Sequence, residues 1–235
     1  MGLAARFIGI ITSPKDTFAR VVASPKWFGM LALTALLMAF FAGLPFATEA
    51  GRLAAIDMAD QQMKTVQKTF GLQMDLDKVH EQVVKTANQM PYRNGGFVLF
   101  FVPIVSVIIA GVFFAIFNAG LGGEASFKQV FAVVVHSGVI SALALMFIGL
   151  VNFFRGAVDP PTNLGLLVPM LPEDSFVASF LGAIDIFRVW GIVVLSMGLA
   201  VLYRRRTQPI AVSLFALYAV IAVLYAFVKS RAGGA

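Results

Sequence analysis

The chain has 235 residues, of which 59% are hydrophobic and only 13% are charged, and its mean hydropathy is +0.87. Soluble domains carry charges on about a quarter of their residues, so this composition excludes a soluble domain and indicates a membrane protein with several spans. Cysteine is absent from the sequence, which excludes disulfides and thiolate metal sites. The net charge of +6 suggests an anionic partner, either nucleic acid or anionic lipid.

The N-terminal segment contains a Ser-Pro pair at residues 13–14, a typical start of a helix. Apolar residues follow it on one helical face, so residues 14–23 are expected to form a short amphipathic helix at the membrane interface. The basic residues around this helix either contact anionic head groups or simply orient the first span. They are Arg6, Lys15, Arg20 and Lys26.

Five apolar stretches are long enough to cross a bilayer, which takes about 20 residues. They cover residues 27–47, 96–118, 127–153, 181–203 and 209–228. The alternative for the first stretch is a cleaved signal peptide, but its span length and the long segment before it disfavour that interpretation. The sequence therefore predicts an all-α polytopic membrane protein, a single membrane domain with five transmembrane helices.

Residues 48–94 form the one extended polar stretch, and two amphipathic helical periods run through it. Gly71 is expected to end the first helix, and Asp75 or Asp77 to cap the second. We expect a helical hairpin outside the bilayer. Its six basic and six acidic residues cancel, so it does not present a nucleic-acid surface.

The fourth apolar stretch carries Asp185 and Arg188 within it, and the rest of the bundle is expected to be organised around this helix. A charge at membrane depth costs at least about 2.5 kcal/mol unless it is paired or reaches the interface. The spacing of three residues allows the two side chains to pair on one helical face, or both simply extend to the interface. With His136 and Asn118 they are the candidate intramembrane polar cluster for binding, although His136 is equally suited to one structural hydrogen bond.

The positive-inside rule predicts a cytoplasmic N-terminus, with the C-terminus and the 48–94 hairpin on the opposite side. In this orientation the cytoplasmic segments carry the whole net charge, and the other side is neutral. Anionic lipid then explains the high isoelectric point, and no nucleic-acid partner is needed. The expected interfacial lipid contacts are Arg6, Lys15, Arg20, Lys26, Arg204, Arg205 and Arg206.

Three stretches together resemble the Yip (Ypt-interacting protein) family in its bacterial form. They are SPKDTFARVVASPKWF, LGGEASFKQV and AIDIFRVWGIVVLSMGLA. The resemblance implies five spans, a cytoplasmic N-terminus and, for a bacterial chain, a place in the plasma (inner) membrane. The eukaryotic relatives act in membrane trafficking, binding small GTPases or shaping membranes. This chain departs from the family pattern in its long 48–94 insertion and in Arg188.

The expected function is that of a non-enzymatic integral membrane protein that binds membrane lipids, and either a partner protein or a second copy of itself. The alternative is a small transporter or channel subunit that uses the intramembrane polar cluster. Against transport, the sequence shows no inverted repeat. An enzyme is disfavoured because His80 and His136 lie on different segments and no HExxH or GxSxG motif is present, so no cofactor and no metal are expected.

Overall fold

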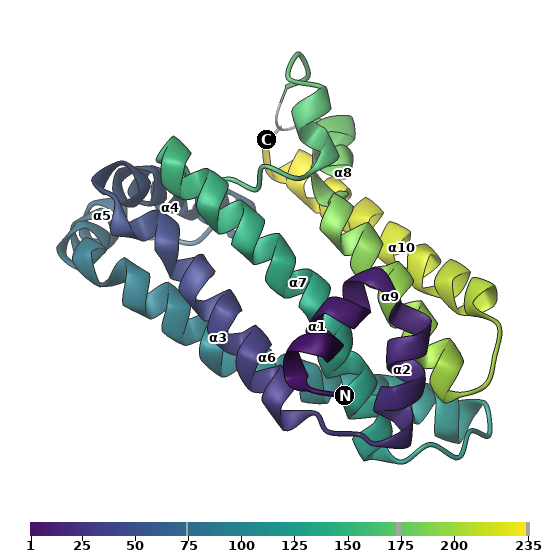
Figure 1. The fold of residues 1–235 in the computed structure, drawn as a ribbon. Coiled ribbons are helices and arrows are strands. Elements are labelled where there is room, and N and C mark those ends of the chain that lie inside the picture. Colours follow the sequence, from purple (N-terminus) through teal and green to yellow (C-terminus); the bar gives the residue numbers. More distant parts are fainter. Residues whose placement is uncertain (74, 173–174, 234–235) are drawn as a thin grey trace. The chain divides into compact units, whose positions relative to one another are not determined.

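A computed structural model describes residues 1–73, 75–172 and 175–233 (Figure 1). Within these residues every regular element is helical, apart from an isolated bridge between Asn163 and Asp185, which confirms the all-α class. The helices are α1 (Leu3–Thr12), α2 (Pro14–Ala23), α3 (Phe28–Gly43), α4 (Glu49–Phe70), α5 (Leu76–Lys85), α6 (Met90–Phe114), α7 (Phe127–Arg155), α8 (Phe176–Ala183), α9 (Ile186–Leu202) and α10 (Thr207–Gly233). Short helical turns lie at Leu44–Ala47, Ala87–Gln89, Ala115–Gly120 and Leu164–Leu167.

Four helical stretches in the described residues are long and apolar enough to cross a membrane. They are Phe28–Ala47, Ala87–Gly120, Phe127–Arg155 and Thr207–Arg231. The expected fourth span over residues 181–203 is interrupted, because α8 ends at Ala183 and α9 begins at Ile186. α9 is apolar but has only 17 residues, so the structure supports several spans without establishing five.

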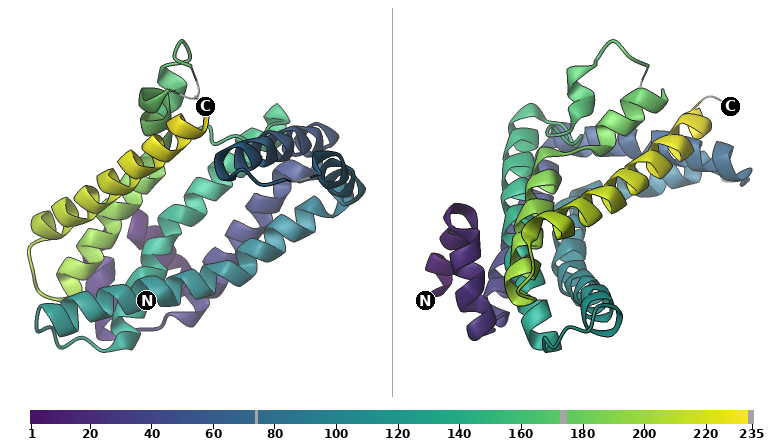
Figure 2. Two further views of the ribbon diagram at one scale, coloured as in Figure 1. Left: turned by 180° about the vertical axis from the view of Figure 1, so that it is seen from behind. Right: turned by 90° about the vertical axis from the view of Figure 1, so that its right-hand side faces the viewer.

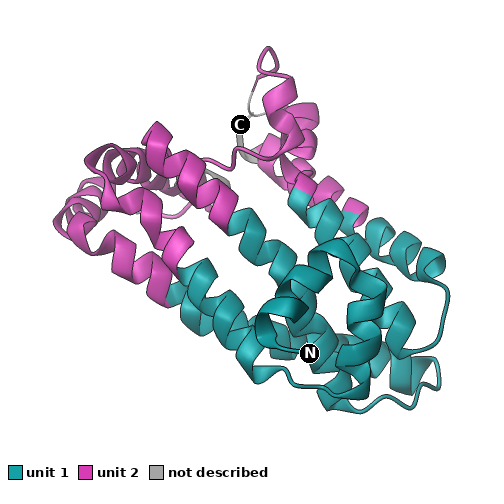
Figure 3. Ribbon diagram, viewed as in Figure 1, with its two compact units in different colours: residues 1–39, 97–145, 187–218 teal, residues 40–96, 146–186, 219–235 magenta. Residues whose placement is uncertain are grey.

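The chain divides into two compact units, coloured in Figure 3. Unit 1 contains residues 1–39, 97–145 and 187–218, and unit 2 contains residues 40–96, 146–186 and 219–235. Figure 2 shows the same helices from two further sides. Glu173 and Asp174, two acidic residues between the third and fourth expected spans, lie outside the described residues.

α7 is the central helix of unit 1. In the most apolar 18-residue stretch of α7, 56% of the residues are buried, whereas the corresponding value for the span that contains α6 is 6%. Val130, Val133, Val139 and Ile140 have no exposed surface. Within unit 1, the helix with the largest buried share among the candidate spans is therefore the third apolar stretch, whereas the expectation that the bundle is organised around residues 181–203 stays a prediction.

α1 and α2 pack on this core. α2 has the expected bounds, but its apolar face is covered by protein: Phe18 is fully buried, as is Ile10 of α1. A Cβ atom added at Gly198 of α9 would lie 2.7 Å from Val133 and 2.9 Å from the Phe18 ring. The glycine is what permits this close approach of α2 to α9. α1 was not expected from the sequence.

In unit 2, α4 and α5 lie against each other as a helical hairpin. Gly71 ends α4 in the left-handed conformation, with φ of 63°, as the sequence predicted. Asp75 caps α5, accepting a 3.1 Å hydrogen bond from the Lys78 backbone N–H. The His80 Nδ1 atom lies 2.7 Å from an Asp60 carboxylate oxygen, which joins the two helices.

Candidate functional site

The charges of the chain are divided unequally between the two units. Unit 1 contains nine basic and two acidic residues, a net charge of +7, whereas unit 2 has a net charge of −1. All the residues predicted to contact lipid head groups belong to unit 1. Most of them are exposed: Lys15, Arg20, Lys26, Arg204, Arg205 and Arg206, with Arg6 partly buried.

The turn that follows α6 is attached to the end of α9 through Asn118. The Tyr203 hydroxyl donates a 2.8 Å hydrogen bond to Asn118 Oδ1, and Asn118 Nδ2 donates a 2.6 Å bond to the Ala125 carbonyl. The Tyr203 ring also stacks on Phe117, with centroids 4.6 Å apart. Asn118, in the helical turn Ala115–Gly120 at the end of a candidate span, therefore connects this turn with the start of α7 and the end of α9.

Gly123 allows this turn to close. A Cβ atom at Gly123 would lie 2.7 Å from the Tyr203 ring and 2.8 Å from the Phe117 carbonyl oxygen, so a larger residue does not fit. The Arg205 guanidinium donates a 3.1 Å hydrogen bond to the Leu121 carbonyl from the other side. These contacts place the arginine run directly beside the glycine-rich turn.

Arg204 adopts a backbone conformation that normally belongs to glycine. Its φ is 51°, and the Arg205 N–H donates a 2.9 Å bond to the Ala200 carbonyl, while the Arg204 N–H reaches the Val201 carbonyl at 3.4 Å. This is the Schellman pattern at the end of α9, which usually has glycine at the left-handed position. An exposed arginine there keeps a positive charge at the cost of backbone strain.

Ser126 and Gln129 form a capping box at the start of α7. The Gln129 N–H donates to Ser126 Oγ at 3.3 Å, and the Ser126 N–H donates to Gln129 Oε1 at 2.9 Å. The Gln129 side chain also donates a 3.2 Å bond to the Val22 carbonyl of α2. Exposed basic residues of unit 1 lie in the segments joined by these contacts. They are Lys26, Lys128, Arg204, Arg205 and Arg206, and we call the surface that they form the basic end of unit 1.

His136 lies in the core and not in an accessible site. It has no exposed surface, and its Nδ1 atom lies 2.7 Å from the Ala132 carbonyl one turn back on α7. Its Nε2 atom has no hydrogen-bond partner among the described residues. His136 and Asn118 thus make separate contacts and share no described hydrogen bond, although both belong to unit 1.

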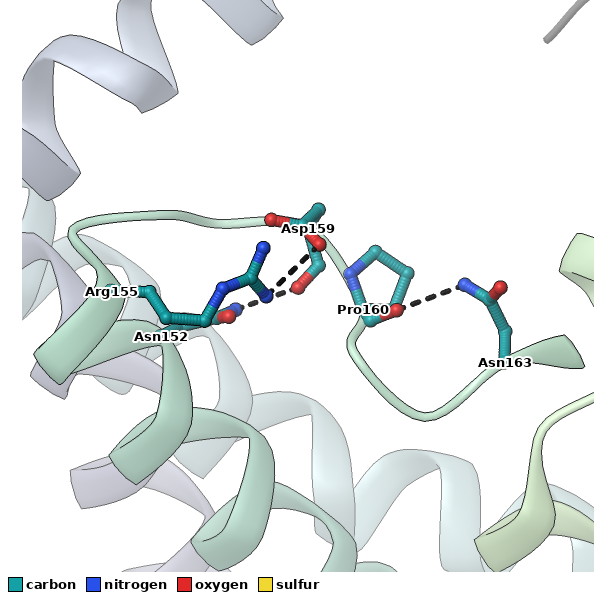
Figure 4. A network of polar contacts seen from close by, with 5 residues as sticks. All are labelled: Asn152, Arg155, Asp159, Pro160 and Asn163. Carbon is teal, nitrogen blue, oxygen red and sulfur yellow. Dashed lines mark hydrogen bonds and ion pairs between the residues drawn. The ribbon is translucent and has the colours of Figure 1, made fainter. Parts of the chain in front are cut away.

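Asp185 lies in unit 2, in a loop that sequence reasoning treated as part of a span. Two residues near the end of α7 hold the loop that follows it. Asn152 Nδ2 donates a 2.8 Å hydrogen bond to the Asp159 carbonyl, and the Arg155 guanidinium donates a 3.3 Å hydrogen bond to the Asp159 carboxylate (Figure 4). Asn163 closes the next turn on the Pro160 carbonyl at 2.9 Å. This loop then runs beside the residues that precede α9.

The Asp185 carboxylate accepts a hydrogen bond from the Thr162 hydroxyl. The Leu164 N–H donates a 2.9 Å bond to the Ile184 carbonyl, so the two segments pair as an isolated bridge. Asp185 directly precedes α9, where the helix N-terminus stabilises a carboxylate. Its expected pairing with Arg188, an exposed residue of α9, stays a prediction.

These helices define an integral membrane protein of several apolar spans. The profile of the Yip1 domain matches residues 8–229, and the chain belongs to the Yip1 domain family. A relative described as "Membrane protein YknW", from Bacillus subtilis (strain 168), is 24% identical over 228 residues, which are 96% of this chain and 91% of the relative. No solved structure matches the chain. The family resemblance inferred from the three short stretches is thus confirmed.

Proposed function

We propose that this Yip1-family protein is a non-enzymatic integral membrane protein that binds anionic lipid through the basic end of unit 1. The observation that carries the proposal is the uneven charge, net +7 in unit 1 and −1 in unit 2. Exposed Lys and Arg side chains near an anionic membrane surface each contribute about 1 kcal/mol of binding. A role in organising the membrane, alone or with a partner protein, follows from such binding.

The proposed membrane arrangement has five crossings, with the basic end in the cytoplasm of a bacterium and the α4–α5 hairpin on the opposite side of the plasma membrane. α9 is the fifth crossing in this arrangement. Its 17 residues span roughly 26 Å, slightly less than the usual hydrocarbon thickness of about 30 Å. Local thinning of the bilayer accommodates such a short helix at modest cost.

The transport alternative receives no support from the described cavities. One, of about 190 Å³, lies in the α4–α5 hairpin and is lined by residues such as Asp60 and His80. The other, of about 450 Å³, lies in unit 1 between α3, α6 and α7. Neither is lined by the residues that a polar path was expected to use, which are Asp185, Arg188, His136 and Asn118.

The test is native mass spectrometry of the protein from nanodiscs that mix phosphatidylglycerol with phosphatidylcholine. Replacing Arg204, Arg205 and Arg206 with Gln removes three charges from the basic end. The matched control replaces Lys64, Lys78 and Lys85 of α4 and α5 with Gln, which makes the same change in net charge.

We expect the first variant to lose retained phosphatidylglycerol by about a hundredfold in affinity, about 3 kcal/mol, and the control to bind like the wild type. Equal loss in both variants would show that only the total charge matters. Unchanged retention in both variants would contradict the proposal.

A further inference from the structure

Unit 1 contains an apolar groove of about 450 Å³ between α3, α6 and α7, a volume within the range of ligand sites. Trp27 and Leu31 line it beside α3, and Pro103 and Val107 line it on α6. Three residues from the first turns of α7 complete the wall and the rim. The groove is outside the polar cluster considered above.

The aromatic wall of the groove is held in place by contacts within the protein. Phe131 is 6% exposed, and the Trp27 ring meets it edge to face at a centroid distance of 5.0 Å. Phe127 stacks on Phe131 at 6.0 Å with nearly parallel rings. The wall therefore does not need to form when a ligand enters, which lowers the entropic cost of binding.

The α6 wall faces outward along its length. Val107 is 47% exposed, and Pro103 lacks an N–H, so it cannot donate to the Leu99 carbonyl one turn earlier. The exposed apolar side chains on this part of α6 suit contact with hydrocarbon and not with water. α7 follows α6 after a short connection, so Val107 and then Pro103 lie progressively farther along α6 from the connection that precedes Lys128.

Lys128 is the charged residue of the lining and lies at the start of α7, on the rim of the groove. Its side chain is exposed, and no ion pair joins it to another residue in the part of the chain that the structure describes. The capping box of Ser126 and Gln129 fixes the turn that carries it. A positive charge at one end of an apolar groove complements a molecule with an anionic head group and a hydrocarbon tail.

We propose that this groove binds a single anionic phospholipid, with one acyl chain along Trp27, Leu31, Val107 and Pro103 and the phosphate at Lys128. The proposal rests on the proposed function and names the lipid class and the position of one bound molecule. Lys128 belongs to the basic end of unit 1, so this site is continuous with the surface proposed to face anionic lipid.

The experiment again uses native mass spectrometry of the full chain from nanodiscs of phosphatidylglycerol and phosphatidylcholine. Val107→Trp fills the groove, and Lys128→Gln removes the charge at its rim. The matched controls are Val105→Trp, at an exposed position of α6 that does not line the groove, and Lys64→Gln, at an exposed lysine of α4 in unit 2. Val107→Phe is a smaller substitution to use if the tryptophan variant does not fold.

We expect Val107→Trp to abolish the most tightly retained phospholipid, and Lys128→Gln to reduce the preference for phosphatidylglycerol about fivefold, with both controls unchanged. If both groove variants retain lipid like the wild type while the Arg204–Arg206 variant loses it, the groove site is wrong and the proposed function stands. If the wild type retains no excess of phosphatidylglycerol, both proposals fail. A wild-type dimer that Val107→Trp dissociates would overturn the lipid site in favour of a second copy.

Discussion

The Tyr203 hydroxyl donates a 2.8 Å hydrogen bond to Asn118 Oδ1, and this bond joins the turn after α6 to the end of α9, 85 residues later in the chain. Both side chains are partly buried, so water replaces the bond poorly when it is lost. The position of the arginine run relative to the glycine-rich turn therefore depends on this pair.

Replacing Tyr203 with Phe should lower the free energy of unfolding by about 1–2 kcal/mol, because Asn118 Oδ1 loses its donor while the ring stack on Phe117 remains. Unfolding in mixed micelles with increasing SDS measures the effect. Tyr92→Phe, at a residue 82% exposed, is the control and should change little. Equal stability of the Tyr203 variant and the wild type would show that the bond is not needed.

Replacing Arg204 with Gly should stabilise the fold by about 1 kcal/mol, because glycine adopts a φ of 51° without a Cβ clash. The same change should weaken retention of phosphatidylglycerol, because it removes a charge from the basic end. Thermal unfolding and native mass spectrometry measure the two effects. Arg206→Gly, at a neighbouring exposed arginine with ordinary φ, should weaken lipid retention without the gain in stability.

His136→Leu should change stability by no more than about 1 kcal/mol. The substitution loses the Ala132 contact but also removes the buried Nε2 atom that lacks a described partner, and these effects offset each other. His136→Ala should instead cost about 2–4 kcal/mol because it leaves a cavity in the core of unit 1. Both are compared by thermal unfolding in detergent. A large loss in His136→Leu would indicate that the imidazole has a polar role.

The cap of α5 should weaken in acid. The ion pair with Lys78 and the Lys78 N–H hydrogen bond lower the pKa of Asp75 below its ordinary value of 3.8. Because the folded-state pKa is depressed, the stabilisation is present above 3.8 and is lost as the pH falls through the lower folded value. NMR of the Lys78 amide during an acid titration should show α5 fraying at its start, and Asp75→Asn should remove this pH dependence. An amide signal that does not respond to acid would contradict the prediction.

Asp185→Ala alone should destabilise the protein more than the double replacement of Asp185 and Arg188 by apolar residues, if the two charges pair as the sequence suggests. The single variant leaves the arginine without its counter-charge and also removes the acceptor for Thr162. Thr162→Val separates these effects, because it removes the hydroxyl and leaves both charges. Equal loss in the single and double variants would argue against the pair.

Local patterns in the sequence were sufficient to predict the membrane class, the all-α fold, the bounds of α2, the end of α4 at Gly71 and the cap at Asp75. Each depends on a short stretch of chain, through hydropathy, helical period or a capping side chain. α1 had the same kind of signal, with Leu3, Phe7, Ile10 and Ile11 on one face. The interruption at Asp185 had no such signal, because it depends on pairing with Thr162 across a loop.

Tertiary structure alone decided which helix is central. The most apolar stretch of the span that contains α6 has a mean hydropathy of 2.8, and 6% of its residues are buried. In α7 the mean hydropathy is lower, 2.3, but 56% of the residues are buried. In a bilayer the lipid tails are as apolar as a leucine side chain, so hydropathy cannot distinguish a helix that faces lipid from one that faces protein. A helix that faces protein has small residues such as Gly198 where a neighbouring helix approaches closely. Which small residues lie at such contacts is known only from the tertiary structure. The groove beside Lys128 also depends on tertiary structure, because Trp27 and Leu31 meet residues of α6 and α7 that come much later in the chain.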